Sequence, residues 1–171
     1  PGASTSGGRR LMPLSLPLSG VRVLDLTMVW AGPYATRILG DLGAEVIKVE
    51  GPRNWDLLRD LSLLPDDPRA YDKSAYFNNL NRNKYGCTID LANPAGRDLC
   101  LRLAALSDVV IENYKVGTLA RYGLAYADLR AVNPGIVYCS VTGFGQDGPF
   151  AARPGYDFIF QGLGGLTSIT G

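Results

Sequence analysis

Residues 21–50, VRVLDLTMVWAGPYATRILGDLGAEVIKVE, decide the fold. The apolar run at 21–27 predicts a strand, Gly32 and Pro33 open a helix over 33–42, and Gly43 ends that helix just before a second strand at 45–49. A strand, a helix and a strand in such a short stretch form a βαβ unit, so the two strands should be parallel with a right-handed crossover. Open parallel sheets bind ligands at the carboxyl ends of their strands, and the free N–H groups at a helix start favour an anion there.

Strand and helix patterns continue to alternate along the rest of the chain. A long polar stretch follows Glu50, with one short helix expected near 55–64. Beyond it, strands are expected at 86–91, 108–112 and 136–141, and helices from Asn93-Pro94 onward and at 117–122, 128–132 and 156–166. The apolar run at 108–112 is typical of a strand covered on both faces. The pattern predicts an α/β fold, with an open, mostly parallel sheet and helices on both of its faces.

The helix that starts at Asn93 carries the clearest local signals. Asn93 is a favourable N-cap, and Pro94 suits the first helical position because proline lacks the N–H group that would stay unpaired there. Leu99, Leu103 and Leu106 recur at helical spacing, which predicts that they form the buried face of this helix.

Composition argues against several classes of protein. The chain has 171 residues, of which 46% are hydrophobic and 19% charged, with a formal net charge of +1. This balance disfavours a nucleic-acid partner, and no apolar run is long enough to span a membrane. The three cysteines (Cys87, Cys100 and Cys139) suit core packing in a cytoplasmic protein, and without histidine no metal site is expected. Residues 1–17 are interpreted as a flexible lead-in, since they lack the apolar core of a secretory signal.

Polar and aromatic residues follow the carboxyl ends of three predicted strands. Trp30 and Ala31 follow the first strand, Asn113-Tyr114-Lys115 follows the strand at 108–112, and Thr142-Gly143-Phe144-Gly145 follows the strand at 136–141. Each is ordinary loop sequence when taken alone, but three such loops on one edge favour a nucleotide-like ligand with a planar ring. The first turn lacks the G-x-G-x-x-G pattern of nicotinamide-binding domains, and no G-x-x-x-x-G-K-[ST] phosphate loop occurs.

Several basic residues are candidates for contacts with phosphates. Arg82 and Lys84 stand in the sequence Asn-Arg-Asn-Lys, and Arg121 lies on the short helix after Asn113, where a binding and a surface role are equally open. For Arg53 and Arg59 a solvated loop is the simpler interpretation.

As an ordered set, these segments resemble the class III CoA-transferases, the CaiB/BaiF-like family of formyl-CoA transferase and carnitine CoA-transferase. The matching stretches are PLSGVRVLDLT (17–27), AGP (31–33), LGDLGAEVIKVE (39–50), NRNK (81–84), ENY (112–114) and GFGQDGP (143–149). The resemblance is strongest to members that use succinyl-CoA or another dicarboxylic acyl-CoA as donor. It implies a Rossmann-like CoA-binding domain over residues 18–171.

The resemblance also implies a role for each group of loop residues. Trp30 and Ala31 would border the acyl-thioester end of the substrate, and the adenine would be flanked by Ile89, Asp90, Leu91 and Ala92. Asn113, Tyr114 and Lys115 would lie along the CoA chain, Arg121 would meet a CoA phosphate, and the pantetheine path would be lined by Thr142, Gly143, Phe144 and Gly145.

Substrates and assembly follow from the same resemblance. CoA and acyl-CoA would be substrates, with a carboxylic acid as the second substrate and no tightly bound cofactor. The complete protein would be an interlocked homodimer, or this chain would pair with a companion chain that carries the remainder.

The catalytic aspartate of this family follows a Gly-Gly-Leu-x-x-x-x-Gly segment like residues 164–171. The nucleophile is therefore expected after Gly171, and no catalytic residue is assigned within this chain. Such an aspartate would attack the donor thioester, giving an acyl-aspartyl anhydride and then an aspartyl-CoA thioester, and the acceptor acid would complete the exchange. The chain by itself is expected to be inactive as a transferase.

Two alternatives stay open. An α-methylacyl-CoA racemase resembles this fold but places a histidine before the aspartate in the segment of Tyr156 and Asp157. Tyrosine, with an ordinary pKa of about 10, is a poor base near neutrality, so the racemase interpretation is disfavoured. The other alternative is a CoA-binding subunit without catalytic activity, which the missing nucleophile supports.

Overall fold

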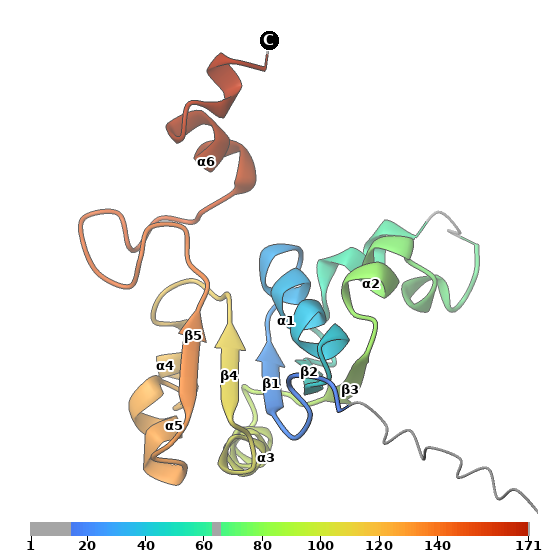
Figure 1. Cartoon of the computed structure of the whole chain (residues 1–171), viewed down its shortest axis with the longest axis vertical. Coiled ribbons are helices and arrows are strands. Elements are labelled where there is room, and N and C mark those ends of the chain that lie inside the picture. Colours follow the sequence, from blue (N-terminus) through green and yellow to red (C-terminus); the bar gives the residue numbers. More distant parts are fainter. Residues whose placement is uncertain (1–14, 63–65, 171) are drawn as a thin grey trace, which may run out of the picture.

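Parallel strands and connecting helices alternate through the computed structural model, which describes residues 15–62 and 66–170 (Figure 1). In chain order the elements are β1 (Arg22–Leu26), α1 (Ala31–Asp41), β2 (Glu45–Glu50), the 3-10 helices η1 (Leu57–Leu61) and η2 (Ala70–Asp72), α2 (Ala75–Leu80), β3 (Lys84–Thr88), α3 (Pro94–Ala105), β4 (Val109–Glu112), α4 (Thr118–Arg121), α5 (Tyr126–Val132), β5 (Val137–Ser140), α6 (Asp157–Leu163) and the 3-10 helix η3 (Leu166–Ser168).

The sheet has five strands in the order β3-β2-β1-β4-β5, and every neighbouring pair is parallel. This arrangement confirms the parallel βαβ unit predicted from residues 21–50. The chain builds outward from β1 to β3 and then crosses to β4 on the other side of β1. The carboxyl ends of β1 and β4 therefore form the switch point of the sheet, the place where open α/β sheets bind ligands.

Helices cover both faces of the sheet, as the sequence predicted. Successive residues of a strand point to opposite faces, so β1 contributes to two cores. Val23 packs with Val46 and with Ala35 and Leu39 of α1 on one face. Leu24 and Leu26 belong to the larger cluster on the other face, whose helical members are Cys100, Ala104, Leu119 and Leu129.

The predicted buried face of α3 is wrong. Leu99 is 47% and Leu106 67% exposed, and Leu103 is only partly buried, whereas Gly96, Cys100 and Ala104 are the buried residues. The cause is close packing of α3 against the end of the preceding strand. A Cβ atom on Gly96 would lie 2.1 Å from the carbonyl oxygen of Asp90, so this face of α3 has no room for a larger residue there. Gly96, Cys100 and Ala104, spaced four apart, share the buried face, while Leu99 and Leu106 are exposed and Leu103 packs partly buried against the larger core.

The stretch after β2 is more ordered than the sequence suggested. The helix expected near 55–64 is the shorter η1, with residues 63–64 outside the described part. α2 was not predicted; the Ser74 hydroxyl caps it by accepting a hydrogen bond from the Phe77 N–H at 3.3 Å. Phe77 and Leu80 then pack on Leu58 of η1 as a small separate cluster. β3 runs from Lys84 to Thr88, earlier than the expected 86–91, because its pairing with β2 begins at Val46 and Lys84.

The two ends of the chain differ in how much the structure describes. Most of the predicted lead-in, residues 1–14, lies outside the described residues. At the other end, α6 contains no buried residue and stands away from the sheet (Figure 1). The helix expected over 156–166 ends at Leu163, because Gly165 adopts a φ of +79° before η3 begins. Within the described ranges, no helix is long and apolar enough to cross a membrane.

Candidate functional site

The turn between β1 and α1 lies at the switch point of the sheet and has an unusual backbone. Val29 adopts a φ of +68°, in the left-handed region that β-branched residues rarely occupy. Gly32 allows the turn to be this tight, since a Cβ atom there would lie 2.3 Å from the Cβ of Thr27. The turn therefore needs support from the surrounding structure to keep its shape.

Two side chains from other parts of the chain supply that support. The Asn113 amide, just after β4, bonds twice to Met28: its Oδ1 accepts from the Met28 N–H at 2.8 Å, and its Nδ2 donates to the Met28 carbonyl at 2.7 Å. The Asp56 carboxylate accepts from the Val29 N–H at 3.1 and 3.2 Å. The turn is thus held at consecutive residues, from β4 on one side and from the loop after β2 on the other.

A buried group of charged side chains lies beneath this turn. Lys48 and Asp56, 2% and 0% exposed, form an ion pair of 3.0 Å, and the Lys48 ammonium also donates to the Thr27 carbonyl at 2.7 Å. The Asp25 carboxylate accepts from the hydroxyl of Thr36 at 2.6 Å and from the Lys84 ammonium at 3.0 Å. Buried charges of this kind are stable only when paired and hydrogen-bonded, as these are.

Burial and pairing together shift the pKa values of Asp25 and Lys84. Burial alone would raise the pKa of the Asp25 carboxyl, but the ammonium groups of Lys84 and Lys48 and the hydroxyl donors outweigh it, so this pKa lies below its ordinary value. Burial lowers the pKa of Lys84 to about 8, although Asp25 opposes that effect. Both groups therefore carry charge at neutral pH, and Lys84 gives up its proton more readily than an exposed lysine.

Most of the basic residues that were candidates for phosphates are already paired with carboxylates. Lys84 is buried against Asp25, so the phosphate role considered for it is wrong. Arg59 is not a solvated surface arginine: its side chain is 17% exposed, and its guanidinium donates to both oxygens of Glu50, at 2.7 and 2.9 Å. Arg82 pairs with Asp41 at 2.7 Å on the surface. Arg53 is exposed, as expected.

The residues expected near the thioester and along the CoA chain meet at the switch point. Trp30 is 56% exposed, and its ring lies 5.7 Å from that of Tyr76 in α2, centroid to centroid. Ala31 is exposed at the first position of α1. Tyr114 packs against the larger core, where burial raises the pKa of its hydroxyl to about 12, and Lys115 is exposed.

The segment expected to flank the adenine divides its side chains between core and surface. Ile89 is buried and Leu91 packs against the same core, so these two side chains face the protein interior. Asp90 is half-buried and accepts from the Ala92 N–H at 3.0 Å and from Arg53 at 3.2 Å, while Ala92 is exposed. Any contact with an adenine here would involve the backbone and the exposed side chains.

The loop after β5 folds onto the segment that follows it. Phe144 packs against Phe150 and Phe160, with ring centroids 5.8 and 5.3 Å apart. Gly143 permits this packing, since a Cβ atom there would lie 2.3 Å from the Phe160 ring. Thr142 is half-buried and Gly145 exposed with a φ of +83°. Arg121 is exposed on α4, where its guanidinium donates to the Thr118 hydroxyl at 3.3 Å.

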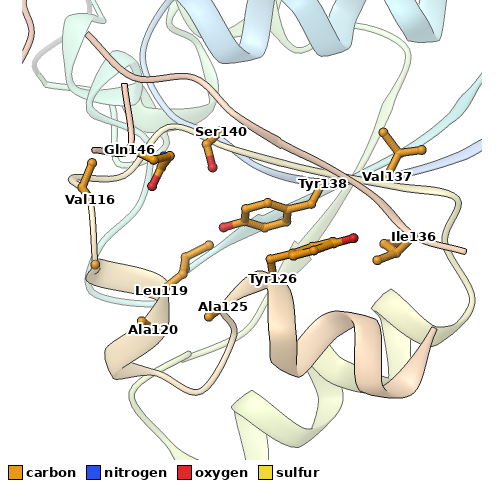
Figure 2. Close-up of a pocket in the computed structure, with 11 residues that line it drawn as sticks. Val116, Leu119, Ala120, Ala125, Tyr126, Ile136, Val137, Tyr138, Ser140 and Gln146 are labelled. Atoms are coloured by element: carbon orange, nitrogen blue, oxygen red, sulfur yellow. The ribbon is translucent and has the colours of Figure 1, made fainter. Parts of the chain in front are cut away.

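A cavity of about 830 Å³ opens between α4, α5 and β5 (Figure 2). The rings of Tyr126 and Tyr138 lie 5.9 Å apart along it, and burial raises the pKa of Tyr138 to about 12. Its wall is mostly apolar, with Ser140 and Gln146 among the polar lining residues. None of the residues assigned from the resemblance lines this cavity, although Val116, Ala120 and Gln146 of its wall directly adjoin the assigned Lys115, Arg121 and Gly145 in the chain.

Sequence reasoning missed Asp56, Lys48 and Tyr76. Lys48, which stands between Ile47 and Val49 in β2, was a signal for a buried ion pair, because a buried lysine requires a partner. Asp56 before Leu57 was a recognisable helix cap: its carboxylate accepts from the Leu58 N–H at 3.0 Å. In the described ranges, no group of three or more metal-binding side chains occurs.

Known proteins similar to this chain carry consistent names. The model of a family described as CoA-transferase family III matches residues 18–171. Succinate–glutarate CoA-transferase from Agrobacterium fabrum is 48% identical over an alignment of 159 residues, which covers 91% of this chain and 39% of that protein. Succinyl-CoA:glutarate CoA-transferase from Mus musculus is 46% identical, covering 100% of this chain and 40% of that protein.

Solved structures agree with these sequence matches. A CaiB/BaiF family protein from Brucella suis has a TM-score of 0.84 and 47% identity, covering 92% of this chain and 41% of that one. The matches confirm the resemblance to class III CoA-transferases, and to members named for succinyl-CoA among them. The chain spans about 40% of the length of the relatives named here.

Proposed function

Because the chain belongs to CoA-transferase family III, we propose that it is the N-terminal, CoA-binding part of an acyl-CoA:carboxylate CoA-transferase. The proposed substrates are an acyl-CoA, with succinyl-CoA as the favoured donor, and a carboxylic acid. The names of the relatives favour a transferase over a racemase, and Tyr156 stands where the racemase interpretation requires a histidine.

The observation that carries this proposal is the contact between two loops at the switch point. The turn before Trp30 and the loop after β4 are joined by the two Met28–Asn113 hydrogen bonds. These loops hold the residues assigned to the thioester end and to the CoA chain. The exposed start of α1 lies beside them, where backbone N–H groups favour a polarised or negative group.

The proposed chemistry uses an aspartate outside this chain. Its carboxylate attacks the thioester carbonyl of the donor and expels CoA as a thiolate, which gives an acyl-aspartyl anhydride. The thiolate then attacks the aspartyl carbonyl, releasing the donor acid and leaving an aspartyl-CoA thioester. The acceptor carboxylate repeats the two steps in reverse order and leaves as the new acyl-CoA. In this scheme the present chain binds and orients CoA.

We further propose an assembly and a compartment. The catalytic protein would be an interlocked homodimer, or a complex in which a companion chain carries the remainder. The cytoplasm is the proposed location, because Cys87, Cys100 and Cys139 are all free thiols.

Isothermal titration calorimetry with CoA tests the proposed CoA-binding role of this chain. Replacing Arg121 by Ala should weaken CoA binding about tenfold, because a charged hydrogen bond to a phosphate is lost. Arg130→Ala is the matched control, since Arg130 is also exposed and lies on the neighbouring helix α5. Failure of the parent chain to bind CoA would refute the proposed function, and an unchanged affinity of Arg121→Ala would refute the phosphate role of that residue.

A further inference from the structure

We propose that Asp56 is a positioning residue for CoA binding. It holds the turn between β1 and α1 in a backbone conformation that is unfavourable for Val29, a residue of that turn. This inference rests on the proposed function. Asp56 does not line the exposed edge of the site: it is 0% exposed and lies beneath the turn. It acts through Val29, whose N–H group it binds.

The strain at Val29 is what makes a positioning residue necessary. A β-branched residue at a φ of +68° is less stable than the same residue in an extended or helical conformation. Without the Asp56 carboxylate as an acceptor for its N–H group, Val29 would be free to leave that conformation. Trp30 and Ala31 follow directly, so a relaxed Val29 would redirect the residues at the start of α1.

The position of Asp56 is itself fixed by its partners. Its Oδ2 accepts from the Lys48 ammonium at 3.0 Å, its Oδ1 accepts from the Leu58 N–H at 3.0 Å, and its own N–H donates to Glu50 at 2.9 Å. Lys48 also donates to the Thr27 carbonyl, two residues before Val29. The carboxylate therefore presents its oxygens to the turn from a rigid base formed by β2 and η1.

The negative charge of Asp56 and its role as a hydrogen-bond acceptor can be tested separately. Lys48 requires the negative charge, but the Val29 N–H requires only an oxygen. If both charges are removed together, an amide oxygen at position 56 should still hold the turn. An apolar side chain of similar size there should release it.

Two double variants separate these roles. Lys48→Met with Asp56→Asn keeps an acceptor, and Lys48→Met with Asp56→Leu removes it; both lack the buried charges. The first should bind CoA nearly as well as the parent chain. The second should bind about 5- to 30-fold more weakly, because the strain of one left-handed residue must then be overcome during binding.

A third substitution distinguishes positioning from general destabilisation. Glycine adopts positive φ freely, so adding Val29→Gly to the acceptor-free variant should recover most of the lost affinity. It would not restore the cap on Leu58 or the lost ion pair, so the thermal unfolding temperature should stay low. Hydrogen exchange in the parent chain should also show a protected Val29 N–H, a measurement that does not require any variant to fold.

The outcomes separate this inference from the proposed function. If the parent chain does not bind CoA, both are overturned. If the parent binds and the two double variants bind equally well, or Val29→Gly gives no recovery, Asp56 is not a positioning residue and the proposed function stands. Rapid exchange of the Val29 N–H in a parent chain that binds CoA would likewise overturn this inference alone.

Discussion

Two regions of this chain depart in opposite ways from the rule that charged side chains are exposed and apolar side chains are buried. At the carboxyl edge of β1 and β2, charged side chains lie inside: Asp25 and Asp56 are 0% exposed and Lys48 is 2% exposed. In the C-terminal segment, apolar side chains lie outside: Phe158 is 81% and Ile169 80% exposed. In the first region every one of these charges bonds to a partner within the fold. Burial therefore follows the supply of partners here, and hydrophobicity alone does not predict it.

The substitution Asp25→Leu tests this comparison with the largest expected effect on stability. This change leaves the Lys84 ammonium buried without its carboxylate, and should lower the free energy of unfolding by about 3–5 kcal/mol in urea denaturation. Adding Lys84→Met should recover a large part of that loss, since an apolar pair can replace a buried ion pair. Glu45→Gln serves as control: it breaks the partly exposed Arg22–Glu45 pair and should cost under about 1 kcal/mol. Equal effects for Asp25→Leu and Glu45→Gln would contradict the assigned importance of the buried charges.

The Asp25–Lys84 pair should also make stability depend on pH, with a smaller effect than the loss of Asp25. The pKa of Lys84 is about 8 in the folded chain and 10.5 ordinarily, so between these values the unfolded chain binds a proton that the folded chain has lost. The free energy of unfolding should therefore rise with pH in that window. Cys100, Tyr114 and Tyr138 oppose the rise, because burial raises the pKa of each to about 12, above its ordinary value of 9.0 for the thiol and 10.0 for the tyrosines.

The rise should consequently be clearest between pH 8 and 9, where it should amount to roughly 0.5–1 kcal/mol. Urea denaturation at these two pH values measures it. Lys84→Met removes the titrating group and should leave a flat or falling profile over the same interval. A rise of the same size in Lys84→Met would show that another group is responsible.

The sequence predicted what depends on local pattern. The strands β1, β2 and β4, the cap at Asn93 and the parallel βαβ unit were all read from neighbouring residues. The buried face of α3 failed because the close approach of Gly96 to Asp90, a contact between helix and strand end, decides which side turns inward. Hydrophobic spacing contains no information on that distance.

For the candidate site, too, the sequence predicted local features and missed those that depend on contacts across the fold. Loops after β1 and β4 were located from the alternation of strands and helices, and the structure joins them through Asn113 and Met28. Asp56 and Lys48 were missed because their roles depend on contacts across the fold. Residues 27 and 56 are far apart in sequence, and only the folded chain shows that both meet the Lys48 ammonium.

The smallest expected effect on stability comes from the exposed residues of α6. Replacing Phe158 and Leu163, 81% and 69% exposed, by Gln should change the free energy of unfolding by less than about 0.5 kcal/mol, because most of each side chain is in contact with solvent. We expect the parent chain to self-associate through this apolar surface, and the double variant to do so less, as measured by size-exclusion chromatography with light scattering. Leu99→Gln with Leu106→Gln is the control: these leucines are also exposed, but Leu99 lies on α3 and Leu106 directly follows it, so their replacement should leave association unchanged. A parent chain that stays monomeric at high concentration would contradict this role for α6. Association lost in both double variants would mean that exposed apolar area in general drives it, so only a loss confined to the α6 variant identifies a specific surface.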